Sequence, residues 1–384
     1  MTGGDRWPVR PEPGEAVPTP FGMSAYCVGD PAAHAPDRDA LVVVHGRDDS
    51  RWTFSEVDDV DRAVAAGLLG LNIVELAGLL FFTGGLQNPF SLLFLAPGAA
   101  KHLGKSYTFE PLNFGSSTLQ ITAISQGEID IAAFGYTSFP LAIQNGGLSD
   151  LRIIADEIVD GAPGYYATQY FVRKDSGIDT IAAMKGKVIA TNGLGSGVDI
   201  AMRSALSKQG LQATRDYTVI EAPFPAHKAI LKEKKADLIV GVLPFSYDPE
   251  LNEFAKPLFT TATGIGSIAL SFWAARKEFI DKNRPALVDL LEDTSAALRW
   301  YYDPANREKA VALTAGYLKR PPAAFESWLF TKRDFYRDMD VKPDLKIVQS
   351  SVDKVKELGF IKDTLEVGKY ADLSLVEEAA KRRH

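Results

Sequence analysis

The stretch Gly127-Glu128-Ile129-Asp130-Ile131-Ala132-Ala133-Phe134-Gly135-Tyr136-Thr137-Ser138 contains a complete transition from strand to helix. Residues 129–134 are mostly apolar and predict a buried strand, and the small and polar residues 135–138 predict a loop that begins a helix. Strands that end in such loops and lead into helices are typical of α/β folds. We therefore expect an α/β protein.

The same pattern occurs at two further places, in residues 113–118 (Asn-Phe-Gly-Ser-Ser-Thr) and 192–198 (Asn-Gly-Leu-Gly-Ser-Gly-Val). In open sheets, ligands bind beyond the carboxyl ends of the strands, where helix N-termini converge. Free backbone N–H groups and the helix dipole favour an anion there, and Ser and Thr hydroxyls add hydrogen-bond donors. A single loop of this kind is usually only a helix cap. Three such loops on different strands predict an anion-binding site.

The rest of the chain from residue 89 onward continues the α/β pattern and then becomes helical after residue 277. Short apolar runs predict strands at 107–109, 152–155, 169–173, 187–191, 217–220 and 237–240. Helical spacing predicts helices at 117–125, 139–145, 198–208 and 226–234. This alternation predicts parallel sheets joined by crossover helices.

Composition excludes several classes of function. The chain has 384 residues and a net charge of −7, with a pI near 5.4, which argues against nucleic acid as a partner. The single cysteine, Cys27, excludes an internal disulfide and a multi-cysteine zinc site, and no two histidines have metal-ligand spacing. His227 is expected to begin an exposed helix.

Catalytic motifs are not found. Leu194 and Val198 occupy the two glycine positions of a G-x-S-x-G nucleophile elbow around Ser196, and Val198 also occupies the position of the last glycine in a dinucleotide-binding fingerprint. We expect no catalytic residue, metal or cofactor. Aromatic residues near predicted loops either form the wall of a ligand cleft or pack between domains: Tyr165, Tyr166, Phe224, Phe245 and Trp273.

The first hundred residues differ from the rest, since they contain no lysine whereas residues 101–384 contain 23. Residues 41–44 and 52–54 predict a hairpin, and Ser55 is expected to cap a helix. The apolar run 63–86 includes Asn72 and Glu75, and it predicts a helix followed by a buried strand rather than a membrane span. Residues 1–20 lack the apolar core of a secretory signal.

Part of this N-terminal segment resembles the beginning of adenylate-forming acyl-CoA synthetases. The resemblance lies in residues 35–43, 52–57 and 65–69. The phosphate loop and catalytic lysine of those enzymes have no counterpart in the chain. The resemblance therefore implies that residues 1–70 are a fragment without catalytic function.

Residues 89–378 resemble the solute-binding proteins of ABC importers, in the nitrate, sulfonate and taurine family. The resemblance rests on residues 115–123, 127–138, 172–178, 184–190, 195–196, 235–238 and 273–275. It implies a two-lobed type II periplasmic-binding-protein fold with a helical C-terminal part. Lobe 1 would comprise residues 71–172 and 268–384, and lobe 2 residues 173–267. The chain would cross between lobes near 170–176 and 267–275, with the first strand at 73–76 or 79–82.

The resemblance also implies a ligand held between the lobes by hinge closure. The implied ligand-binding residues are Asn88, Ser91, Ser116, Ser117, Tyr136, Thr137, Ser138, Asn192, Ser196, Gly197, Val198 and Phe245. The expected ligand is a small organic anion, a sulfonate or a carboxylate, and the expected partner is a membrane permease. The family implies a periplasmic location. The alternatives are an enzyme on the same fold, of the type that makes thiamine precursors, or a fragment of an adenylate-forming ligase.

Overall fold

The computed structural model describes residues 39–45, 48–53, 71–74, 76–77, 92, 95–110 and 117–382, with side chains for 92, 95–109 and 120–382. The chain divides into two compact units, Met1–Leu69 and Gly70–His384. In the first unit, β1 (Asp39–His45) and β2 (Asp48–Thr53) form an antiparallel hairpin in which His45 pairs with Asp48. This confirms the predicted hairpin, although β2 begins earlier than expected. The helix predicted after Ser55 lies outside the described residues.

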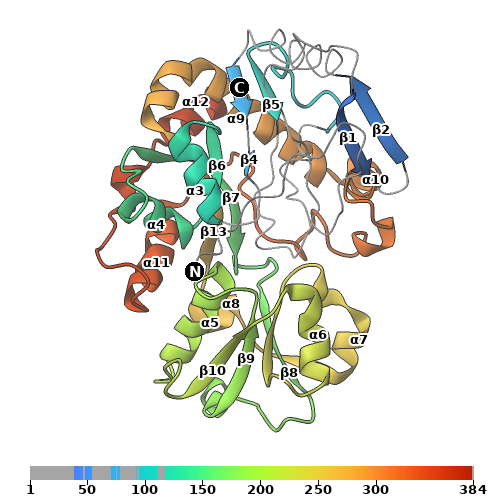
Figure 1. Ribbon diagram of the computed structural model, residues 1–384, viewed down its shortest axis with the longest axis vertical. Helices are drawn as coiled ribbons and strands as arrows, with labels where there is room; N and C mark the ends of the chain where they lie inside the picture. Colours follow the sequence, from blue (N-terminus) through green and yellow to red (C-terminus); the bar gives the residue numbers. More distant parts are fainter. Residues whose placement is uncertain are drawn as a thin grey trace, which may run out of the picture. The chain divides into compact units, whose positions relative to one another are not determined.

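A four-stranded sheet forms one half of the second unit (Figure 1). Its strands, in spatial order, are β4 (Leu76–Ala77), β6 (Ile131–Gly135), β13 (Ile268–Arg276) and β7 (Leu151–Asp160). β13 is antiparallel to both of its neighbours, and β4 is parallel to β6. A separate parallel pair joins β3 (Leu71–Val74) to β5 (Tyr107–Glu110). Of the two candidates for the first strand, residues 73–74 belong to β3 and residue 76 to β4, and 79–82 lies outside the described residues.

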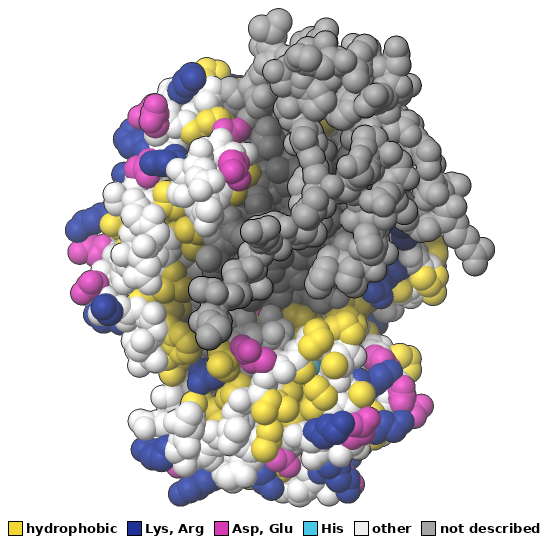
Figure 2. Space-filling model, in the orientation of Figure 1, with side chains coloured by type: hydrophobic (Ala, Val, Ile, Leu, Met, Phe, Trp, Pro, Cys, Tyr) yellow, Lys and Arg dark blue, Asp and Glu magenta, His cyan; other side chains and the backbone are white. Residues whose placement is uncertain are grey.

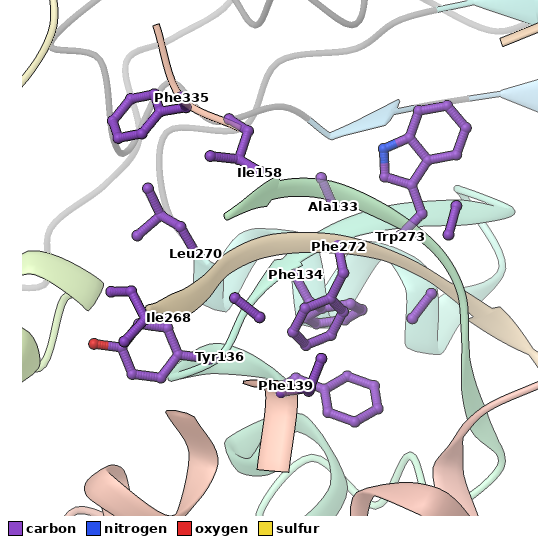
Figure 3. Packing of buried hydrophobic residues seen from close by; sticks show 14 of the residues in the cluster. Ala133, Phe134, Tyr136, Phe139, Ile158, Ile268, Leu270, Phe272, Trp273 and Phe335 are labelled. Atoms are coloured by element: carbon purple, nitrogen blue, oxygen red, sulfur yellow. The ribbon is translucent and has the colours of Figure 1, made fainter. Parts of the chain in front are cut away.

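Aromatic side chains form the core beside the four-stranded sheet. The ring of Phe139, from α4 (Ser138–Gln144), lies 5.7 Å from that of Phe134 and 5.2 Å from that of Phe272, both edge-on. Such edge-to-face pairs add to the stabilisation from apolar burial. Figure 3 shows these rings together and Tyr136 at one end of the cluster, with its hydroxyl directed away from them. The neighbouring helix α3 spans Ser117–Gln126.

A five-stranded sheet forms the other half of the second unit. Its strands, in spatial order, are β10 (Tyr217–Glu221), β9 (Lys187–Thr191), β11 (Leu238–Gly241), β8 (Gln169–Arg173) and β12 (Ala255–Thr260). β10, β9 and β11 are parallel, whereas β8 and β12 run antiparallel to their neighbours. The predicted parallel strands with crossover helices are therefore present within a mixed sheet. Figure 1 shows helices on both sides of it: α5 (Gly197–Ser207), α6 (Phe224–Lys232), α7 (Pro249–Phe254) and α8 (Thr261–Ile265).

The chain passes between the two sheets at residues 161–168, after β7, and at residues 266–267, before β13. The first crossing was predicted near 170–176, which is wrong, because β8 already belongs to the five-stranded sheet. Strand β7 also differs from the expectation, since it has ten residues instead of the predicted four. Its polar pair Asp156 and Glu157 is buried, so the strand continues through residues that interrupt the apolar pattern.

The C-terminal part is helical, as predicted. It contains α9 (Lys277–Tyr302), α10 (Arg307–Tyr317), α11 (Leu345–Glu357) and α12 (Ser374–Lys381). Helix α9 has a non-helical residue, Asn283, just before Pro285, as expected where proline interrupts a helix. Across the described residues, no helix has the length and apolar character needed to span a membrane.

Candidate functional site

Local hydrogen bonds between Gly135 and Ser138 hold the junction between β6 and α4. The Ser138 hydroxyl accepts a hydrogen bond from the Gly135 N–H at 3.1 Å and lies 3.3 Å from the Gly135 carbonyl, to which it donates. Tyr136, Thr137 and Ser138 are all buried. The short loop therefore turns the chain from strand to helix without leaving these polar groups in water.

The junction between β9 and α5 is held by a longer set of hydrogen bonds. Ser196 caps α5 by accepting the Asp199 N–H, and its hydroxyl donates to Asn192 Oδ1 at 2.9 Å. Asp199 Oδ2 accepts the Gly195 N–H at 2.8 Å and the Arg203 Nε–H at 2.8 Å. Burial raises the pKa of Asp199, and the Arg203 guanidinium opposes this rise. This network fixes the loop in front of the helix.

Two buried tyrosines reach the start of α5 from the two sheets. The Tyr136 hydroxyl donates to the Gly197 carbonyl at 2.5 Å, and the Tyr170 hydroxyl donates to the Val198 carbonyl at 2.9 Å. Tyr136 follows β6 of the four-stranded sheet, whereas Tyr170 lies on β8 of the five-stranded sheet. Burial raises the pKa of both phenols well above the ordinary value, so both remain protonated donors. The hydrogen bond of Tyr136 thus joins the two predicted ligand loops.

Asp160 is a buried carboxylate at the first crossing. Its Oδ1 accepts the Thr168 N–H at 2.8 Å, and its Oδ2 accepts the Thr261 hydroxyl at 2.9 Å. Thr261 begins α8, just before the second crossing. Burial raises the pKa of Asp160 to about 6, although these hydrogen bonds oppose the rise. Asp160 therefore links the first crossing to the start of α8, the helix that precedes the second crossing.

The aromatic residues noted in the sequence differ in their surroundings. Trp273 is 0% and Phe224 3% exposed, so both fill the interior. Tyr166 is also buried, and its hydroxyl donates to the Gly241 carbonyl or the Ser246 hydroxyl, at 2.8 and 2.9 Å. Phe245 is only partly buried. Interior packing thus accounts for most of this group.

The described structure contains eight of the twelve predicted site residues with their side chains. It brings Tyr136 of the β6–α4 junction to Gly197 of the β9–α5 junction, and Ser196 to Asn192. Ser117 begins α3, but its side chain is not described. Asn88, Ser91 and Ser116 lie outside the described residues. Ligand binding by these residues stays a prediction.

His227 corrects one expectation. It is 2% exposed rather than at the surface, and its two ring nitrogens each lie 2.9 Å from a carbonyl oxygen, of Val240 and Ala222. Burial lowers its pKa. The sequence predicts a solvated start of α6, but this face of the helix packs against β11.

A histidine and two acids lie together outside the predicted site. His102 Nε2 is 3.3 Å from Glu292 Oε2, and its Nδ1 is 3.8 Å from Asp289 Oδ2. Lys101 pairs with Glu292 at 2.5 Å, and Arg382 pairs with Asp289 at 2.7 Å. Since both carboxylates already have cationic partners, the cluster is explained as an ion-pair network that holds the 101–102 turn and the C-terminus against α9.

Sequence reasoning did not single out Asp160, Asp199 or Tyr170. Asp199 was detectable, because Ser196 and Asp199 have the Ser-x-x-Asp spacing of a helix cap. The roles of Asp160 and Tyr170 depend on partners far away in the sequence, Thr261 and Val198. No local signal identifies those contacts.

Charged side chains are mixed on the visible described surface. Figure 2 shows Lys and Arg interspersed with Asp and Glu, with no broad patch of one sign on this face.

Residues 97–315, more than half of the chain, match the model of the NMT1-like family, and the chain belongs to that family. No curated protein matches it. Its fold is that of the two-lobed type II periplasmic binding proteins, with a helical C-terminal part, as predicted.

Three similar solved structures illustrate the range of proteins with this fold. The Escherichia coli periplasmic aliphatic sulphonate binding protein SsuA has a TM-score of 0.60 and 19% identity, covering 77% of this chain and 96% of its own. The periplasmic nitrate-binding protein NrtA from Synechocystis PCC 6803 has a TM-score of 0.58 and 16% identity, covering 80% and 87%. The desulfurization enzyme DSZB has a TM-score of 0.59 and 14% identity, covering 81% and 99%.

Proposed function

We propose that this chain is the solute-binding component of an ABC importer and captures a small organic anion, a sulfonate or a carboxylate, between two lobes by hinge closure. The observation that carries the proposal is the hydrogen bond from Tyr136 to Gly197, because it brings two predicted ligand loops from different sheets together. The solved sulphonate- and nitrate-binding proteins with a similar fold support it.

The start of α5 supports an anionic ligand. Within the described part of the chain, the N–H groups of Gly197 and Val198 have no hydrogen-bond acceptor, as expected in the first turn of a helix. The positive end of the helix dipole lies at the same place. Arg203 balances the nearby negative charge of Asp199. An anion that accepted both N–H groups would complete this helix terminus.

The lobes, partner and location follow from the same proposal. We propose residues 1–70 as a separate N-terminal fragment followed by two lobes, with the boundary expected at 172/173 moved to 168/169, so that lobe 1 comprises 71–168 with 268–384 and lobe 2 comprises 169–267. Because β8 pairs with β11 and β12, residues 169–172 group with lobe 2. A membrane permease would receive the ligand, and the protein would act outside the cytoplasmic membrane.

Isothermal titration calorimetry of the full chain tests this function. The titrants are ethanesulfonate, taurine, benzoate, acetate and nitrate, with ATP as the probe of the ligase alternative. We expect one organic anion to bind with 1:1 stoichiometry and Tyr136→Phe to bind it more weakly, whereas Tyr317→Phe, on α10, should bind normally. Binding of ATP alone would overturn the proposal.

The enzyme alternative has one observation in its favour, the similarity in fold to DSZB. The only cysteine of this chain, Cys27, lies outside the described residues. Release of sulfite from an aromatic sulfinate by the purified chain would favour an enzyme. Binding of a sulfonate that is recovered unchanged would favour solute capture.

A further inference from the structure

A side chain from the C-terminal part packs on the loop that carries the predicted ligand residues of α5. Gly195, in this loop, has φ +77°, and a Cβ built on it would lie 3.1 and 3.3 Å from Cε1 and Cδ1 of Phe360. The Phe360 ring therefore rests directly on the backbone at Gly195. A larger residue at this position would meet both a strained backbone and the ring.

Phe360 follows a helix of the other half of the unit, α11, which also contacts α5. The Phe360 N–H donates to the Val355 carbonyl at 3.0 Å, after Gly359 with φ +78°. These features are typical of a glycine C-cap. Helix α11 packs against β13 of the four-stranded sheet. The ring thus spans the boundary between the two sheets while its own backbone is fixed to one of them.

The ring also contacts the network that holds the loop. The Arg203 guanidinium lies 5.8 Å from the Phe360 ring centroid, within the range of a cation–π contact. Arg203 pairs with Asp199, which accepts the Gly195 N–H. Phe360 is 36% exposed and the adjacent Leu194 56% exposed, so neither side chain serves mainly to fill the core.

A second contact joins the same two halves at another place. The Tyr247 hydroxyl, after β11, donates to the Arg333 carbonyl at 2.9 Å, and the Arg333 guanidinium lies 4.6 Å from the Tyr247 ring centroid. Like the Phe360 contact, it uses none of the predicted ligand residues. Both contacts depend on the two sheets lying close together.

From the packing of Phe360 on Gly195, we infer that Phe360 is a positioning residue that latches the ligand loop, residues 192–198, in the closed arrangement. This inference rests on the proposed solute-binding function. A contact that exists only in the closed arrangement raises ligand affinity without touching the ligand, because it shifts the population toward the binding-competent state. Removing it should increase the rate of ligand release more than it changes the rate of association.

The test compares Phe360→Ala with Leu95→Ala, which truncates another exposed apolar residue, 44% exposed, away from the loop. Both are made in the full chain with Cys27→Ser and spin labels at Gln209→Cys and Lys309→Cys, two exposed positions on different halves. Pulsed electron paramagnetic resonance measures the distance between the two spin labels. Calorimetry measures the Kd for ethanesulfonate, or for another of the tested anions if that is the one that binds the wild type.

We expect Phe360→Ala to lengthen the label distance in the ligand-free protein and to raise the Kd about 3- to 30-fold, as for the loss of one apolar contact and one cation–π contact. Leu95→Ala should change neither quantity. Gly195→Ala should act in the same direction as Phe360→Ala, and Phe360→Leu provides a milder variant if the alanine variant unfolds.

An unchanged label distance together with an unchanged Kd in Phe360→Ala would overturn the latch. If the wild type bound none of the anions, the solute-binding proposal would fail, but the label distance would still decide the latch. A longer distance would support it, and an unchanged one would overturn it.

Discussion

The β6–α4 and β9–α5 junctions share one sequence pattern, a strand followed by small and polar residues that begin a helix, yet their hydrogen bonding differs. In the first junction, Ser138 satisfies Gly135 within four residues. In the second, the bonds extend from Asn192 through Ser196 and Asp199 to Arg203. The first junction therefore depends on local geometry, whereas the second depends on a buried ion pair.

This difference shows where a strand-to-helix loop can be specialised. Asp199 and Arg203 fix the backbone at Gly195, so the first N–H groups of α5 keep a defined position while remaining free of acceptors in the described structure. The first junction instead sends the Tyr136 hydroxyl across to the second. The β9–α5 loop offers hydrogen-bond donors to a ligand, and the β6–α4 loop holds it in place through the Tyr136 hydroxyl.

The largest expected effect concerns the ion pair of the second junction. Asp199→Ala removes the acceptor of the Gly195 N–H and leaves Arg203, whose side chain is 12% exposed, without its anion. Breaking a buried pair in this way should lower the free energy of unfolding by about 3–5 kcal/mol. Urea denaturation measures the change, with Asp363→Ala as the control, because Asp363 is exposed and has no ion pair among the described residues. A loss no larger than in the control would mean that the network does not stabilise the junction.

The next effect is a pH dependence at Asp160, which adjoins both tyrosines. Its pKa in the folded protein, about 6, lies above the ordinary value of 3.8, so the folded state binds the proton more tightly than the unfolded state. Its contribution to stability therefore falls as pH rises from about 4 to about 6, by about 3 kcal/mol in total. Asp160→Asn should lack this component.

Unfolding in urea at pH 4, 5, 6 and 7 measures this contribution as the difference between wild type and Asp160→Asn. The exposed carboxylate variant Asp175→Asn serves as control. Parallel pH profiles for the wild type and Asp160→Asn would contradict the assignment.

A smaller effect on stability is expected for the two tyrosines that donate to α5, and their effects on anion binding should differ. Tyr136→Phe and Tyr170→Phe each remove the phenol that donates to one carbonyl of α5, and each should lower the free energy of unfolding by about 0.5–1.5 kcal/mol. Only Tyr136 connects the two sheets, so only Tyr136→Phe should also weaken anion binding through easier opening. Equal affinities of the two variants in calorimetry would show that the bond between the loops has no role in closure.

The smallest effect compares the two serines. Ser196→Ala removes a helix cap together with the hydrogen bond to Asn192 and should cost about 1 kcal/mol, whereas Ser138→Ala removes only hydrogen bonds to Gly135 and should cost about 0.5 kcal/mol. Thermal unfolding of the two variants, with Ser125→Ala on α3 as the exposed control, measures both. A larger loss of stability in Ser138→Ala than in Ser196→Ala would mean that the β6–α4 junction depends more on its serine than the β9–α5 junction does.

Local sequence patterns were sufficient to predict most individual strands and helices. The strands at 169–173 and 187–191 were predicted with the observed bounds, since apolar runs followed by turn residues identify strands without knowledge of their neighbours. The pattern failed at β7, where buried acids continue the strand, and it missed β12 and β13, of which β13 begins at the second crossing. Burial of polar residues depends on partners that adjacent residues do not reveal.

The sequence by itself determined the α/β class, the helical C-terminal part and the two loops that meet at Gly197, because each depends on the periodicity and turn chemistry of adjacent residues. Only the tertiary structure decided the bond of Tyr136 to Gly197, the burial of Asp160 between Thr168 and Thr261, and the packing of Phe360 on Gly195. These contacts join residues 61, 101 and 165 positions apart in the chain. They form only when the two sheets come together, so no local pattern encodes them.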